Sequence, residues 1–435
     1  MSLLHRLSWP CLIAALVAVA GSAAAGDVET RYQEHCAACH GETRLGGVGP
    51  ALLPENLERL RKPEALNVIR DGRVATQMPG FADKLNADEL RQLAEWIYTP
   101  VVPAPVWGEK EIRGSHVVDA AAARLPARPG RGLKGADPLN LFIVVETGDH
   151  HISVLDGDKL ERLHRFPSRY ALHGGPKFSP DGRFVYFASR DGWISKFDLY
   201  NLVVVAEVRA GLNTRNAAVS SDGKWVLVAN YLPHSLVVLD AADLSLARII
   251  PTWNAAGNKT SRVSAVYDAA PRKSFVVALK DVPEAWELSY DPAAEPVAEG
   301  LVHDFQYKEG AFKPGMFHPR RTLLTDYLDD FFFTQSYDEI LGSSRSATKG
   351  QVIFLDGRKK VAELDLPGMP HLGSGITWKW KDPAGRERTV MASPNLNAGL
   401  VTVIDLETYE TVKQIPTLGP GFFLRSHENS RYAFT

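Results

Sequence analysis

The chain has 435 residues, of which 45% are hydrophobic and 23% charged, with a formal net charge of -2. At about 100–200 residues per domain, this length indicates two or three domains with large apolar cores. Collagen-like, coiled-coil and disordered chains are excluded, because the repeats or charge excess they need are absent. The near-neutral charge argues against a nucleic-acid partner. Three cysteines are too few for a disulfide scaffold, whereas 35 glycines and 28 prolines indicate many turns between short strands.

Residues 1–25 have the pattern of a secretory signal peptide. A cationic start is followed by the apolar run Leu7–Ala20 and by small residues suited to cleavage. The alternative is a membrane anchor, but this run is shorter than the ~20 residues that span a bilayer. We therefore expect a protein exported to the periplasm. Processing would remove Cys11 and leave Cys36 and Cys39.

A C-x-x-C-H motif follows, in Cys36-Ala37-Ala38-Cys39-His40. This motif is typical of covalent haem c, in which each thiol adds to a vinyl group and the histidine binds the iron. A zinc site would need a second ligand pair nearby, and a thioredoxin-like redox pair would need a βαβ context. A disulfide across so short a loop is sterically awkward. The sequence therefore predicts haem c held by Cys36, Cys39 and His40.

A second axial ligand and a closing helix complete this first domain. Met78 lies in a Met-Pro-Gly turn and is the candidate ligand, because a thioether raises the haem potential. Asn86 precedes residues 90–98, whose apolar residues recur at helical spacing. With Gly49-Pro50 between them, these features make residues 27–99 resemble a class I cytochrome c, which implies an all-α fold and electron transfer.

Proline-rich residues 99–105 mark the end of that domain. The expected organisation is a cytochrome c domain over residues 26–105, a linker over 106–138 and a second domain over 139–435.

The second domain carries repeated strand units. A strand–turn–strand pattern around Asp181-Gly182 recurs 41 residues later around Asp222-Gly223. A second strand ending in aspartate follows each unit and recurs near the C-terminus, at Asp198, Asp240, Asp356 and Asp405. A period of about 40–50 residues is typical of a β-propeller, and a β-sandwich is the alternative. Because an unclosed propeller exposes sheet edges, we expect the chain to lack roughly its last blade.

A c-type cytochrome joined to a propeller resembles the cytochrome cd1 group, whose eight-bladed propeller holds haem d1. The matching residues are Tyr170-Ala171-Leu172-His173 and Ser189-Arg190-Asp191-Gly192. The resemblance implies that His173 is the proximal iron ligand and that Arg190 contacts carboxylates of the macrocycle. Further matches that would line the pocket are Arg215, Arg262 and Lys280. Haem d1 carries several carboxylates, so its pocket favours such cations; solvated surface charges are the alternative.

The resemblance also separates two branches of the group. His371 matches the first of the two distal histidines of cytochrome cd1 nitrite reductase, but residues 391–399 hold no second histidine. This favours the dihydro-haem d1 dehydrogenase branch, which oxidises a propionate to an acrylate and passes electrons to haem c. His371 would then be the distal ligand or a catalytic group, and His427 the candidate acid/base, with a capping role in a turn as its alternative.

Nitrite reduction and non-enzymatic transport of haem d1 remain the alternative functions. The resemblance implies three kinds of partner: the tetrapyrrole, cytochrome cd1 nitrite reductase with other haem d1 maturation proteins, and a soluble electron acceptor.

Overall fold

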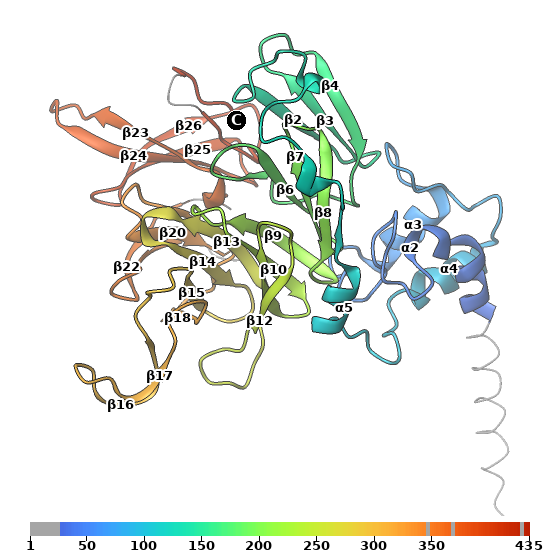
Figure 1. Ribbon diagram of the computed structural model, residues 1–435, viewed down its shortest axis with the longest axis horizontal. Coiled ribbons are helices and arrows are strands. Elements are labelled where there is room, and N and C mark those ends of the chain that lie inside the picture. Colours follow the sequence, from blue (N-terminus) through green and yellow to red (C-terminus); the bar gives the residue numbers. More distant parts are fainter. Residues whose placement is uncertain (1–26, 345–348, 367–369, 427–429) are drawn as a thin grey trace, which may run out of the picture. The chain divides into compact units, whose positions relative to one another are not determined.

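The computed structural model describes residues 27–344, 349–366, 370–426 and 430–435 (Figure 1). The chain forms two compact units, Met1–Val106 with Leu141–Leu172 and Trp107–Asn140 with His173–Thr435. The predicted signal peptide and His427 lie outside the described residues. Within the described ranges, no helix is both long and apolar enough to cross a membrane.

The helices of the first unit form the predicted α-helical domain. They comprise residues 27–35, α2 (Ala37–His40), α3 (Lys62–Asp71) and α4 (Ala87–Trp96). Asn86 caps α4 as expected, since its side chain accepts hydrogen bonds from the backbone N–H groups of Asp88 and Glu89. The apolar side of α4 packs into a core made of Tyr32, Leu57, Ala65, Ile69, Phe81, Leu90 and Leu93.

The first unit also contains an antiparallel sheet of β2 (Leu141–Glu146), β3 (His151–Asp156) and β4 (Arg162–Pro167). The β2–β3 turn contacts the loop that carries Met78, because Gln77 Nε2 donates to the carbonyl oxygen of Asp149 at 3.4 Å. Part of the strand-rich sequence thus groups with the helical domain.

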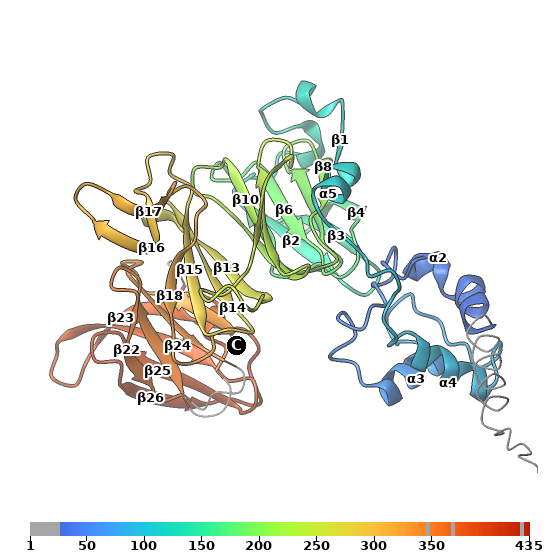
Figure 2. The same cartoon turned by 90° about the horizontal axis from the view of Figure 1, so that it is seen from below.

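Successive antiparallel sheets build the second unit (Figures 1 and 2). The strands, in chain order, are β5 (Lys177–Phe178), β6 (Phe184–Ala188), β7 (Trp193–Asp198), β8 (Val203–Arg209), β9 (Asn213–Val219), β10 (Trp225–Leu232), β11 (Ser235–Asp240), β12 (Leu246–Pro251), β13 (Val263–Ala269), β14 (Ser274–Leu279), β15 (Glu284–Ser289), β18 (Arg320–Leu323), β19 (Asp330–Phe333), β20 (Glu339–Ser343), β21 (Gly350–Phe354), β22 (Lys359–Leu364), β23 (Ile376–Lys381), β24 (Glu387–Pro394), β25 (Leu400–Asp405) and β26 (Thr411–Pro416).

The repeated aspartates end strands for a local reason. Asp198 Oδ1 accepts from the backbone N–H groups of Tyr200 and Asn201, and Asp240 Oδ1 accepts from that of Ala242. A carboxylate in this position folds the chain into a turn and releases it into the next strand. The strands predicted before these aspartates are confirmed as β7 and β11.

Neighbouring sheets meet along their first strands. Arg215 Nε on β9 donates to the carbonyl oxygen of Ser264 on β13, and Ser264 Oγ donates to that of Leu328, just before β19. Repeated four-stranded sheets joined in this way form a propeller-type arrangement. The eight-bladed count and the missing last blade stay predictions.

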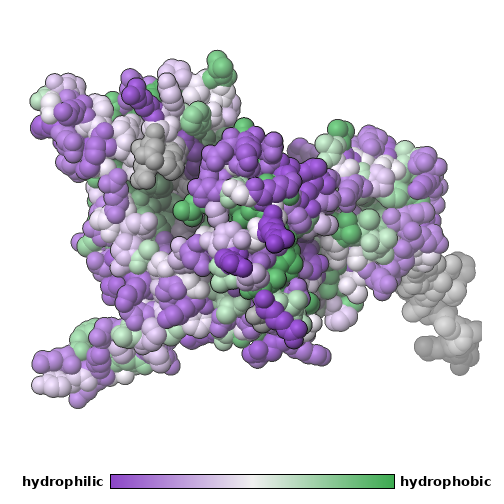
Figure 3. All heavy atoms as spheres, turned by 45° about the horizontal axis from the view of Figure 1, so that its top comes forward, coloured by the Kyte–Doolittle hydropathy of each residue, from purple (hydrophilic) through white to green (hydrophobic). Residues whose placement is uncertain are grey.

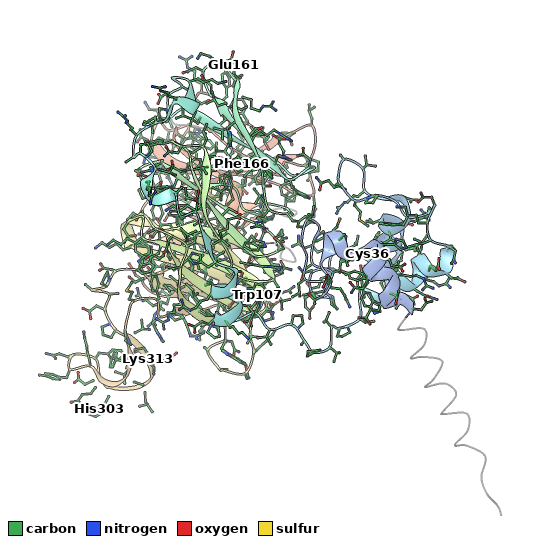
Figure 4. The ribbon with its side chains drawn as sticks, turned by 45° about the vertical axis from the view of Figure 1, so that its right-hand side comes forward. Cys36, Trp107, Glu161, Phe166, His303 and Lys313 are labelled. Carbon is green, nitrogen blue, oxygen red and sulfur yellow. The ribbon has the colours of Figure 1, made fainter. Side chains whose placement is uncertain are left out.

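Residues 107–138, which fall within the predicted linker, are folded into the second unit. They carry α5 (Glu109–Ser115), β1 (Val117–Val118) and the 3₁₀ helices η1 (Ala122–Arg124) and η2 (Arg131–Leu133), and β1 pairs with β8. Trp107, labelled in Figure 4, donates its indole N–H to the carbonyl oxygen of Arg209 at 2.9 Å. Ile112 is only 1% exposed in the core of this unit.

A hairpin of β16 (Val297–Asp304) and β17 (Glu309–Lys313) is inserted between β15 and β18. The hairpin projects from the sheet that contains β15 and β18, and Figure 4 labels two of its residues, His303 and Lys313. Its large apolar side chains Leu301, Phe305 and Tyr307 are exposed, and Figure 3 shows hydrophobic colour among hydrophilic atoms on this segment.

Candidate functional site

His40, at the end of α2, is held in an orientation suited to a metal ligand. Its Nδ1 lies 2.9 Å from the carbonyl oxygen of Pro50. A carbonyl oxygen can only accept, so Nδ1 carries the proton and Nε2 keeps a free lone pair. Burial lowers the pKa of His40, which favours the neutral form that binds a metal.

Cys36 directly precedes α2, and Cys39 lies within it. Cys36 is half-buried against the helical core, and Cys39 is exposed. Burial, and secondarily the neighbouring Cys39, raise the pKa of Cys36 to about 11.

Met78 lies in the loop after α3 and packs against the same core as Cys36. Two backbone contacts hold it, because Arg73 N–H donates to the Met78 carbonyl oxygen at 3.0 Å and Met78 N–H donates to Thr76 Oγ1 at 3.2 Å. The core beside Cys36 is thus bordered by a thioether, as the sequence predicts. Its ligation of iron stays a prediction.

Sequence reasoning missed Arg44, which is 4% exposed. Its guanidinium donates to the carbonyl oxygens of Leu52, Ile97 and Thr99 and lies 4.6 Å from the centre of the Trp96 ring. This arginine ties the loop after the C-x-x-C-H motif to the end of α4. A lone arginine in a loop carries no pattern that would have revealed this.

In the second unit, the partners of His173 show which of its two ring nitrogens carries the proton. Nδ1 lies 2.7 Å from the carbonyl oxygen of Arg215, so it carries the proton. Arg215 Nη1 lies 2.6 Å from Nε2 and 3.2 Å from Nδ1, so the guanidinium lies across the imidazole rather than along the lone pair of Nε2. With the proton on Nδ1, Nε2 is unprotonated, which is the form of histidine that can bind a metal ion.

The other predicted cations lie together, but they differ in their partners. Arg190 and Arg262 both lie over the ring of Tyr231, at 5.8 and 5.5 Å. Arg262 forms an ion pair with Asp281, and Lys280 forms one with Asp329, each at 2.7 Å. The positive charges of Arg262 and Lys280 are thus already compensated within the protein.

His371 lies beside an acidic group that sequence reasoning missed. Its Nδ1 is 2.6 Å from the carbonyl oxygen of Phe422, and its Nε2 is 3.6 Å from Asp330 Oδ2. Tyr267 donates its hydroxyl to Asp330 Oδ1 at 2.8 Å. Burial raises the pKa of Asp330, and it also raises that of Tyr267, so both favour their neutral forms.

A cavity of about 550 Å³ lies where the strands β9, β13 and β19 end. It is lined by Lys177, Tyr267, Asp268, Phe333, Thr334, Tyr337, Gly373 and Thr377, among others. Tyr267 therefore borders both this cavity and the Asp330–His371 contact. Sequence reasoning missed Lys177, which lines this cavity, and Arg425, which donates a hydrogen bond to Ser374. Both lie in stretches without a recognised motif, so the sequence offered no signal for them.

Comparison with known protein families shows which class of protein this chain belongs to. Residues 136–435 match the family described as cytochrome D1 heme domain. Residues 23–97 match that described as cytochrome C oxidase, cbb3-type, subunit III. Fold and sites thus define a cytochrome c domain followed by a sheet-rich, propeller-type haem domain. The chain belongs to the cytochrome D1 heme domain family.

Two individual proteins and one solved structure are similar to most of this chain. The chain is 56% identical to the dihydro-heme d1 dehydrogenase of Pseudomonas aeruginosa over 407 residues, which cover 94% of this chain and 76% of that protein. It is 26% identical to the nitrite reductase of Stutzerimonas stutzeri, over 80% of this chain and 61% of that protein. The solved structure of dihydro-heme d1 dehydrogenase NirN in complex with DHE matches with a TM-score of 0.81 and 55% identity, over 93% of this chain and 80% of that one.

Proposed function

We propose that this protein is a dihydro-haem d1 dehydrogenase, which oxidises a propionate side chain of the haem d1 precursor to an acrylate. The observation that carries the proposal is the unprotonated Nε2 of His173, which lies beside Arg215 in a chain that also holds a C-x-x-C-H motif. The near full-length similarity to a dehydrogenase of this name supports it.

Cys36 and Cys39 would carry covalent haem c, and His40 and Met78 would be its axial ligands. The fit rests on the unprotonated Nε2 of buried His40 and on the thioether beside Cys36. Bound haem c accepts one electron at a time. Arg44 and α4 hold the surrounding loops in place, which keeps water from the core at this site.

The substrate would bind in the second unit through His173 and the surrounding cations. Arg215 has to leave Nε2 of His173 when the iron of dihydro-haem d1 arrives. Its guanidinium would then be available to a carboxylate of the macrocycle. Arg262 and Lys280, which are ion-paired, would contribute positioning more than charge.

The reaction breaks one C–H bond on each of the two methylene carbons and forms a C=C bond between them. It releases two protons and two electrons, and haem c held by Cys36, Cys39, His40 and Met78 would supply the one-electron acceptor. His371 and His427 are the proposed groups for distal ligation and proton transfer. The contact of His371 with Asp330 supports a role for His371, because it orients the imidazole.

We further infer that residues 1–25 direct export to the periplasm, and that cytochrome cd1 nitrite reductase receives the product. A soluble acceptor would reoxidise haem c. The similarity to a nitrite reductase over 80% of this chain supports a shared cofactor.

The test is to bind dihydro-haem d1 to the full chain and to measure the mass of the tetrapyrrole before and after an electron acceptor is added. Loss of two hydrogens is expected. An unchanged mass together with tight binding would indicate a carrier, and robust nitrite turnover a reductase; either result would refute the proposal. His173→Ala should abolish axial ligation, and an unchanged haem d1 spectrum would refute that assignment.

A further inference from the structure

Two cations beside the cavity of the second unit have no acidic partner among the described residues. Lys177 donates through Nζ to the carbonyl oxygen of Gly174 at 2.6 Å. Arg425 donates through Nη1 to Ser374 Oγ at 3.2 Å and to the carbonyl oxygen of Leu424 at 3.0 Å. Neither bond neutralises a charge. This separates the two residues from Arg262 and Lys280, which have carboxylate partners.

Lys177 and Arg425 converge on one place. Lys177 lines the cavity together with Tyr267, Gly373 and Thr377. Ser374, which binds Arg425, directly follows Gly373. The two residues are 248 positions apart in the chain, so only the folding of the second unit brings them together.

The electrostatics at this place favour an anion. Burial lowers the pKa of Lys177, and the charge of Arg425 lowers it further. The charge of Arg425 also reaches Tyr267, where it acts against the burial that raises the pKa of that residue. Asp268 also lines the cavity, but within the described part of the chain it forms no ion pair with either cation. Two like charges held close together are unfavourable, and a bound anion relieves their repulsion.

We propose that Lys177 and Arg425 form a carboxylate-binding site, and that the carboxylate is a side chain of the tetrapyrrole. A guanidinium fork and an ammonium group together suit the two oxygens of a carboxylate. The tetrapyrrole is the source of this carboxylate because the cavity is linked to His371. Tyr267 borders the cavity and donates to Asp330, which contacts His371. This inference rests on the proposed function. A free small carboxylate is the other source of the same chemistry.

The experiment compares binding of dihydro-haem d1 with that of its methyl ester, in which the carboxylates are blocked. The full chain carrying haem c is used as wild type, Lys177→Met and Arg425→Gln. Each substitution should raise the Kd for the acid form about tenfold or more, as loss of a charge-assisted hydrogen bond does. The Kd for the ester should stay the same in all three proteins. Lys313→Met, on the exposed β16–β17 hairpin, is the matched control and should change neither Kd.

Equal loss of acid and ester binding, or no loss of either, would overturn the proposal. Acetate alone is titrated by calorimetry in a second arm. Acetate binding that needs Lys177 and Arg425, with tetrapyrrole binding unaffected by their substitution, would overturn the assignment to the tetrapyrrole. The mass of the bound tetrapyrrole is followed separately. Wild-type protein that binds the acid form through these residues but removes no hydrogens would refute the dehydrogenase and leave this site standing.

Discussion

His40 and His173 lie in different units, yet the same device orients both rings. Each Nδ1 faces a backbone carbonyl oxygen, that of Pro50 at 2.9 Å and that of Arg215 at 2.7 Å. Because the carbonyl fixes the proton on Nδ1, each Nε2 is unprotonated, which suits the predicted role of both histidines as iron ligands. The motifs identify these histidines, but the residues that supply the two carbonyls follow from the folded chain.

Asp268 gives a pH-dependent prediction at the residue scale. Burial raises the pKa of its carboxyl to about 6, although Tyr290 donates its hydroxyl at 2.8 Å. The folded state therefore binds this proton more tightly than the unfolded state. Its contribution to stability is full below the ordinary carboxyl pKa and is lost as pH rises through about 4 to 6.

Asp268→Asn should accordingly remove part of the fall in unfolding free energy over this pH range. Urea unfolding of the second unit at several pH values measures it. Asp365→Asn, at an exposed position of the same unit, is the control and should keep the wild-type profile. An identical pH profile for wild type and Asp268→Asn would contradict the prediction.

At the scale of elements, local chemistry explains why the strands were predictable and one segment was not. The predicted strands before Asp198, Asp240 and Asp405 are observed as β7, β11 and β25. Each aspartate accepts hydrogen bonds from the turn that follows it, so the signal is contained in a few residues. The segment with α5 and β1 lacks such a signal, because its order comes from docking on β8.

The loop that holds Met78 depends on a glycine after α3. Gly72 has φ +77°, and a Cβ there would lie 2.8 Å from the Met78 carbonyl oxygen and 2.7 Å from Gly80 N. Gly72→Ala should therefore displace Met78 and weaken the thioether–iron bond, which the haem c spectrum and reduction potential report. Gly135→Ala is the matched control, since it has φ +83° but open space around the Cβ. Equal effects of both substitutions would exclude the steric explanation.

At the scale of the whole molecule, each site is contained in one unit. Cys36, His40 and Met78 lie in the first unit, whereas His173, Arg215 and His371 lie in the second. Binding of the tetrapyrrole and exit of its electrons should therefore be separable by substitution.

Cys36→Ala with Cys39→Ala tests this separation, because it removes the covalent attachment of haem c. The variant should bind dihydro-haem d1 with a wild-type Kd and spectrum, because the binding unit keeps all its residues. It should fail to remove two hydrogens when the acceptor is supplied. The mass of the bound tetrapyrrole measures this outcome, and full conversion by the variant would contradict a role for haem c as electron exit.

The amino-acid sequence by itself determined the features that a few neighbouring residues encode. The C-x-x-C-H motif, the Asn86 cap and the strand-ending aspartates are of this kind, because their partners lie within a turn of the chain. These features identify the two fold types and the candidate iron ligand His40, whereas His173 is a candidate only through the resemblance to the cytochrome cd1 group.

Only the tertiary structure decided how the charges are paired. Lys280 and Asp329, Tyr267 and Asp330, and His371 and Phe422 are each separated by tens of residues in the chain. Such contacts depend on which sheets pack together, and no local pattern records that choice. As a result, the cations of the second unit that can bind a ligand carboxylate differ from those that the sequence predicted. Two predicted carboxylate binders are compensated internally, whereas Lys177 and Arg425 keep their charges for a ligand.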